Sequence, residues 1–220
     1  MERTGDVRSG IRAALPLVVP TLALGVSFGV LAEPVMGSIA PIAMSLLVLS
    51  GGAQFAALSV LQAGGTAAAA IGAGLLMNAR WLPMSFAVAP SLAGSTPRRA
   101  LESQAIVDAS FVLASRPNGT FDRGTLIGSA LPQYSSWIVG TALGTFAGGA
   151  LDEPGRFGLD AIFPAFYLTL LAAELREHGA RTAWLAAVLA SAVTLALLPF
   201  APAGVPIIAA SAAALIGLGR

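Results

Sequence analysis

Long apolar stretches, separated by short polar ones, run along most of this 220-residue chain. A helix needs about 20 apolar residues to cross a bilayer core that is about 30 Å thick. By that measure the chain holds seven candidate spans, near residues 13–32, 41–62, 66–90, 124–150, 160–175, 182–199 and 203–219. The pattern predicts an all-α, polytopic membrane protein with about seven hydrophobic segments, organised as a single membrane domain over residues 1–220.

A polar segment, Ser91 to Arg123, interrupts this pattern between the third and fourth spans. Its inner part, Leu101 to Ser115, is too short and too charged to cross a bilayer easily. We therefore predict one interfacial or half-inserted helix there.

Composition supports a membrane location and excludes several functions. The chain is 56% hydrophobic and 10% charged, whereas soluble domains carry about 25% charged residues. All 12 basic residues are Arg and the net charge is +1, so no basic patch for nucleic acid is expected. The chain has no Cys, and its single His178 has no companion ligands, so no metal is expected. It also lacks a P-loop and a Ser/His/Asp grouping, so we expect neither an enzyme nor a cofactor.

The distribution of Arg distinguishes two topologies, because short cytoplasmic loops collect positive charge. If all seven segments cross with the N-terminus inside, the loop Arg residues show no bias towards either side. If 66–90 instead enters the membrane and returns to the same side, Arg156 alone lies outside. We favour this second topology, with a cytoplasmic N-terminus in a multi-pass protein of the inner membrane. The polar trio Asn78-Ala79-Arg80 is then the natural position for the helix to break.

The first candidate for a transport site is the run Gly51-Gly52-Ala53-Gln54-Phe55 in the second apolar segment. A buried amide without a partner is costly in lipid, so Gln54 should face protein, water or a ligand. Gly51 and Gly52 weaken the helix and would open backbone carbonyls that can hold an ammonium group. An amide that simply bonds to a neighbouring helix fits the sequence equally well.

Arg80 is the second candidate, because an Arg inside a span costs at least about 2.5 kcal/mol and needs a counter-charge. A substrate carboxylate, held by Arg80 with help from Asn78, would supply that charge. The alternatives are a structural ion pair with Asp108 or a side chain that reaches the membrane interface. Asp108 and Asp160 are candidate coupling or network carboxylates, although Asp160 could instead cap a helix.

The two halves of the chain, 10–95 and 120–200, also look alike. Each opens with an Ala-Leu-Pro triplet and two later glycines spaced four residues apart, Ala14-Leu15-Pro16 with Gly25 and Gly29, and Ala130-Leu131-Pro132 with Gly140 and Gly144. Internal repeats, parallel or inverted, are common in secondary transporters, but Ala/Leu/Gly-rich helices also resemble one another by chance. The Gly25/Gly29 pair is independently a small-xxx-small pattern that favours close helix packing.

Taken in order, these motifs resemble the AzlC/YgaZ branched-chain amino-acid exporters. The resemblance is carried by Gly51-Gly52-Ala53-Gln54-Phe55, Asn78-Ala79-Arg80, Asp108-Ala109-Ser110-Phe111, Trp137 with Gly140 and Gly144, and Gly158-Leu159-Asp160-Ala161 with Pro164-Ala165-Phe166. Ala109 departs from the pattern, since many members have an acidic or larger residue after that aspartate.

The resemblance implies an inner-membrane permease that exports valine, leucine or isoleucine by secondary transport, together with a separately encoded small membrane subunit of the AzlD/YgaH type. In this hypothesis Arg80 and Asn78 hold the carboxylate of the amino acid, and Gln54 with opened carbonyls takes the ammonium. Alternatives are a transporter of another small zwitterion or organic anion, and a non-transporting assembly subunit. The latter predicts that protein groups satisfy both Gln54 and Arg80.

Overall fold

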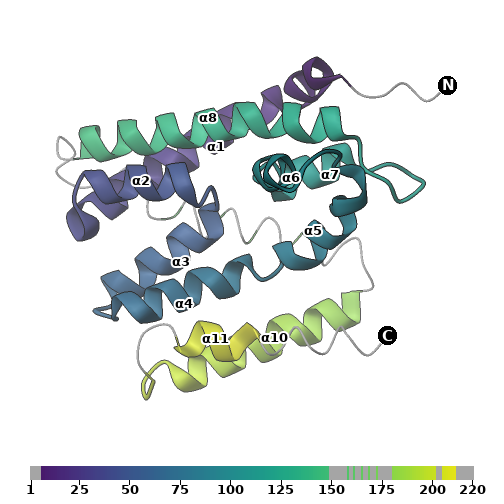
Figure 1. Cartoon of the computed structure of the whole chain (residues 1–220). Helices are drawn as coiled ribbons and strands as arrows, with labels where there is room; N and C mark the ends of the chain where they lie inside the picture. The colour runs from purple at the N-terminus through teal and green to yellow at the C-terminus, as the bar shows by residue number, and fades with distance from the viewer. Residues whose placement is uncertain are drawn as a thin grey trace. The chain divides into compact units, whose positions relative to one another are not determined.

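The computed structural model describes residues 6–148, 158, 161, 165, 168, 172, 180–201 and 205–211 (Figure 1). These residues form helices and connecting turns, with one isolated bridge between Ser115 and Phe121, so the all-α prediction is confirmed. The chain divides into two compact units. Unit 1 comprises Met1–Gly51 and Asn78–Asp152, and unit 2 comprises Gly52–Met77 and Glu153–Arg220.

The described helices of unit 1 lie between Val7 and Gly148. They are α1 (Val7–Met36), α2 (Ile39–Leu47), α5 (Trp81–Val88), the 3-10 turn η1 (Ala89–Ser91), α6 (Thr96–Ser103), α7 (Asp108–Ala114) and α8 (Arg123–Gly148). Unit 2 contains nearly all of α3 (Gly51–Gln62) and α4 (Ala67–Asn78), and also α10 (Ala180–Leu197) and α11 (Val205–Ser211).

Among the described residues, α1 is long and apolar enough to cross a membrane, and Ala67–Asn78 and Trp184–Leu197 are shorter apolar helices. The predicted segment at 160–175 lies almost entirely outside the described residues. The count of seven segments therefore stays a prediction.

Helices α1 and α8 pack side by side and run in the same direction (Figure 1). Gly10, near the start of α1, lies against the backbone of Thr125, near the start of α8. Further along, Gly25 lies against the backbone of Gly140. The residue numbers rise together along both helices, as they must in a parallel pair.

This parallel pair is so close that its central glycines have no room for a side chain. A Cβ on Gly29 would lie 2.2 Å from the carbonyl oxygen of Thr141, and one on Gly144 would lie 2.1 Å from that of Val26. The small-xxx-small interpretation of Gly25 and Gly29 is thereby confirmed. The two glycine pairs that look like a repeat in the sequence are each other's packing partners.

The predicted spans 41–62 and 66–90 are each built from two helices. The second breaks where the sequence predicts, since α4 ends at Asn78 and α5 begins at Trp81. The first breaks earlier than predicted, at residues 48–50, so Gly51 and Gly52 lie inside α3. The break falls there because Leu49 adopts a left-handed conformation with φ of 41°, which ends α2 at a cost of about 1–2 kcal/mol.

Helices α2 and α5 together return the chain along α8. Ser45 on α2 shares a buried hydrogen bond of 2.9 Å with Thr141, in the second half of α8. Val88, at the end of α5, packs in a cluster with Leu126 near the start of α8. Within unit 1 the chain therefore runs back once along α8, from the end of α1 to the start of α8. Residues 52–77 of unit 2 interrupt this return in the sequence, between α2 and α5. This arrangement favours the topology in which α1 and α8 begin on the same side of the membrane.

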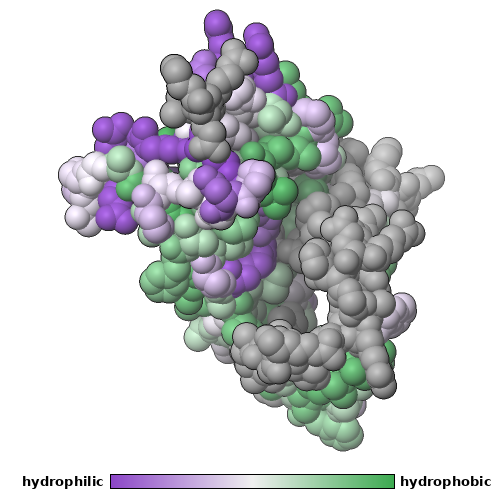
Figure 2. Space-filling view, turned by 90° about the vertical axis from the view of Figure 1, so that its right-hand side faces the viewer, coloured by the Kyte–Doolittle hydropathy of each residue, from purple (hydrophilic) through white to green (hydrophobic). Residues whose placement is uncertain are grey.

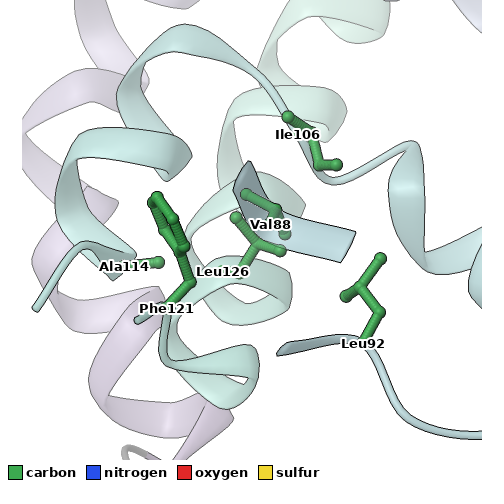
Figure 3. Close-up of a cluster of buried hydrophobic side chains, with 6 residues drawn as sticks. All are labelled: Val88, Leu92, Ile106, Ala114, Phe121 and Leu126. Carbon is green, nitrogen blue, oxygen red and sulfur yellow. The ribbon is translucent and has the colours of Figure 1, made fainter. Parts of the chain in front are cut away.

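The polar segment folds at the start of α8, and its predicted single helix over Leu101–Ser115 is wrong. Residues 104–107 separate α6 from α7, because Ile106 leaves the helix to join a buried cluster. The members of this cluster are Val88, Leu92, Ile106, Ala114, Phe121 and Leu126 (Figure 3). Figure 2 views the molecule from the side on which α6 and α7 lie in Figure 1, and shows hydrophilic residues gathered in the upper part of that view.

Replacement of Gly144 by Ala should destabilise the protein by about 1–3 kcal/mol, because the added methyl group forces α1 away from α8. A matched Gly→Ala change at Gly72 in α4, where a Cβ would meet no described residue within 4 Å, should instead stabilise its helix by about 1 kcal/mol. Thermal unfolding of the detergent-solubilised variants measures both effects. Equal unfolding temperatures for the two variants would contradict the close packing.

Candidate functional site at the two helix breaks

The two helix breaks of unit 1 are joined directly by a hydrogen bond. Ser50, at the first break, donates its hydroxyl to Oδ1 of Asn78 at the second, over 2.6 Å. Ser50 is almost fully buried. Two segments that are far apart in the sequence are thus fixed side by side at the points where their helices stop.

The first break is further supported by two aromatic residues of α8. The hydroxyl of Tyr134 donates to the carbonyl oxygen of Leu46, one of the groups that the end of α2 leaves without an intrahelical donor. The ring of Trp137 lies where a side chain on residue 51 would be, because a Cβ on Gly51 would be 2.8 Å from its Cη2 atom. Close approach of Trp137 therefore explains Gly51.

At the second break, Arg80 forms a bidentate ion pair with Asp108. Its Nε donates to Oδ1 over 3.1 Å and its second terminal nitrogen donates to Oδ2 over 2.8 Å. The structural ion pair that the sequence left open as an alternative is therefore present. Its members are accessible, since the Arg80 side chain is 37% exposed and that of Asp108 is 62% exposed.

Trp81 follows Arg80 and begins α5. The guanidinium carbon of Arg80 lies 5.9 Å from the centre of the Trp81 ring, within the range of a cation–π contact. The indole Nε1 of Trp81 is buried and has no hydrogen-bond acceptor among the described residues. A donor in that situation costs about 1–3 kcal/mol unless an acceptor is supplied.

Asp108 is held in place by the start of α7. It is the first residue of that helix, and the backbone N–H of Val107 just before it donates to Ser110 Oγ over 3.1 Å. The fully buried Ser110 hydroxyl also donates to the carbonyl oxygen of Val107. This local network fixes the backbone from which Asp108 reaches Arg80.

Two further ionic clusters tie the polar segment to α8. Glu102 on α6 accepts hydrogen bonds from Arg98, four residues earlier, and from Arg123, the first residue of α8. The charge-assisted hydrogen bond from Arg123 is the main cause that lowers the pKa of Glu102 to about 2, with Arg98 adding to it against the effect of burial. Asp122 caps α8 by accepting from the backbone N–H of Thr125 over 2.6 Å, and it pairs with Arg116.

The structure brings some of the predicted site residues together. Asn78, Arg80 and Asp108 lie in unit 1 around the joined breaks, and Gly51 follows Ser50 there. Gly52 and Gln54 belong to unit 2, where Gln54 is fully buried within α3. Asp160 lies outside the described residues.

Sequence reasoning missed three residues of this region, namely Ser50, Trp81 and Tyr134. Ser50 directly precedes the glycine pair and Trp81 directly follows Arg80, so their positions beside the two motifs were the available signal. Nothing in the sequence indicates that Tyr134 would reach the end of α2.

Comparison with known proteins shows the family to which this chain belongs. The model of the AzlC protein family matches residues 16–151, which is more than half of the chain. The chain belongs to the AzlC family. The region that matches the AzlC family model contains both helix breaks and Asp108.

Two relatives agree with this assignment. A protein of Archaeoglobus fulgidus, described as an uncharacterized membrane protein, is 29% identical over 97% of this chain and 94% of its own length. Inner membrane protein YgaZ of Escherichia coli is 26% identical over 76% of this chain and 73% of its own length. No solved structure matches. This AzlC-family chain is thus a membrane protein, and its family and relatives support a transporter-like role.

Replacement of Glu102 by Gln should destabilise the protein at neutral pH, because a neutral amide loses the charge-assisted bonds to Arg98 and Arg123. The wild-type carboxylate has its pKa lowered from 4.5 to about 2, so its stabilising effect is present above pH 4.5 and is lost as the pH falls towards 2. Unfolding of both proteins in detergent, followed between neutral pH and about pH 3, should therefore show a shrinking difference. A difference independent of pH would contradict this assignment.

Proposed function

We propose that this chain is the large subunit of an inner-membrane permease that exports branched-chain amino acids by secondary transport. The observation that carries the proposal is the meeting of two interrupted helices, joined by Ser50 and Asn78, beside the accessible charge of Arg80. Backbone that leaves the helix within a membrane segment is characteristic of transporters, where it lines the substrate path. Membership of the AzlC family supports the same role.

The chemistry of this region suits the carboxylate of an amino acid. Arg80 offers a planar fork of donors that matches a carboxylate. Because Oδ1 of Asn78 accepts from Ser50, its side-chain nitrogen is the group that can donate to a ligand. The two residues therefore present several donors at one break. Gln54, predicted to hold the ammonium group, is assigned to that role only by its motif.

The proposed orientation places the N-terminus in the cytoplasm. The parallel packing of α1 and α8 puts Arg8 and Arg12 at the same end of unit 1 as Arg116 and Arg123, in agreement with the positive-inside rule. A small membrane subunit of the AzlD/YgaH type is the proposed partner.

A second candidate function is that of a non-transporting assembly subunit. It is favoured by the ion pair between Arg80 and Asp108 and by the complete burial of Gln54, since both residues then have structural roles. A transporter of another small zwitterion differs from the first proposal only in its cargo.

Counterflow of labelled valine in proteoliposomes separates these candidates. The exporter should show saturable exchange, measured with the chain alone and with its small partner added. Absence of exchange in both preparations, with the proteins folded, rejects the exporter in favour of the assembly subunit. If the protein exchanges other amino acids but not valine, only the proposed substrate changes and the transport function stands.

Arg80→Ala and Gln54→Ala should each abolish counterflow while the protein remains in the membrane. The exposed residues Arg99 and Gln62 provide matched controls, and their Ala variants should exchange valine at the wild-type rate. Wild-type exchange by Arg80→Ala or Gln54→Ala would remove that residue from the site.

A further inference from the structure

The ion pair between Arg80 and Asp108 is a structural link, and its two charges also match those of a ligand that carries one negative and one positive group. It presents one positive and one negative group in contact, over 2.8 Å, and both side chains are accessible. Neighbouring groups leave part of both side chains uncovered, so a ligand can reach either charge. A ligand that offers the opposite charges in the same spacing can therefore replace it.

We infer that the amino acid substrate inserts into this ion pair, so that its carboxylate binds Arg80 and its ammonium binds Asp108. The inference rests on the proposed function and names the group that recognises the ammonium. An α-amino acid carries its carboxylate and its ammonium group on the same carbon atom. Its binding therefore replaces the ion pair between Arg80 and Asp108 with two ion pairs, one to each side chain, and leaves no charge unpaired. Asp108 is thereby an ammonium-binding group in addition to Gln54, the residue that the sequence predicts for that role.

Trp81 supplies a second, independent observation at the same place. Its buried indole N–H has no acceptor among the described residues, although it follows Arg80 in the chain and its ring lies near the guanidinium group. A carboxylate has two oxygens that accept several hydrogen bonds. Substrate bound to Arg80 would supply an acceptor to the Trp81 N–H, which has none among the described residues, and Trp81 would fix the carboxylate end.

The pairing predicts that recognition requires both charges of the substrate. Valine should bind more tightly than isovalerate, which lacks the ammonium group, and more tightly than isobutylamine, which lacks the carboxylate. Asp108 should account for the preference for valine over isovalerate, and Arg80 for the preference for valine over isobutylamine. A purely structural ion pair would give variants that lose affinity for all three compounds together.

The test is equilibrium binding of valine, isovalerate and isobutylamine to the full-length chain, in the preparation that shows counterflow. Asp108→Asn should weaken valine by at least about tenfold, the loss of one charge-assisted hydrogen bond, and should not weaken isovalerate. Arg80→Gln should weaken valine and isovalerate and should not weaken isobutylamine. Trp81→Phe should behave as Arg80→Gln does, with a smaller loss.

Asp122→Asn is the matched control, because it neutralises another Arg-paired Asp of the same polar segment and should leave all three affinities unchanged. The inference is overturned if Asp108→Asn weakens valine and isovalerate equally, or weakens neither. If Asp108→Asn fails to fold, Trp81→Phe decides, and equal losses for isovalerate and isobutylamine overturn the inference. A wild-type chain that binds no aliphatic amino acid rejects the proposed function and the inference together, whereas parallel losses in the variants reject the inference alone.

Discussion

The backbone contact between α1 and α8 is the constraint on which the rest of unit 1 depends. Glycines such as Gly29 and Gly144 let the two helices approach until a single methyl group would collide with the opposite chain. Because the pair is parallel, the chain must return from the end of α1 to the start of α8. Helices α2 and α5 make that return, and both helix breaks fall within it.

Each break leaves polar backbone groups without an intrahelical partner. Tyr134 satisfies one of them, the carbonyl oxygen of Leu46 at the end of α2, and the hydroxyl of Ser50 links the two breaks through the side chain of Asn78. The remaining charge of Arg80 is offset by Asp108, whose helix is positioned by the folded polar segment. The buried cluster in that segment therefore has a consequence at the site, because it anchors Ile106, which lies two residues before Asp108.

Local chemistry was the part of this structure that the sequence could predict. Asn78 and Arg80 in an apolar run indicated a break, and an Arg that needs a counter-charge indicated Asp108 as one of its candidate partners. The first break was misplaced, because Gly51 and Gly52 looked like its cause, whereas Leu49 ends the helix and Gly51 makes room for Trp137. The parallel pairing of α1 with α8 was beyond prediction, since glycine spacing shows that a helix packs closely without identifying its partner.

Cysteine labelling from one side of the membrane tests the parallel pair most directly, and the chain has no Cys of its own to interfere. Single Cys variants at the exposed residues Ser9, Ile39 and Asn118 place a probe in the first turn of α1, at the first residue of α2, and in the loop before α8. In intact cells and inverted vesicles, an impermeant maleimide should label Ser9→Cys and Asn118→Cys from the same side and Ile39→Cys from the other. Labelling of the Ser9 and Asn118 positions from opposite sides would contradict the account.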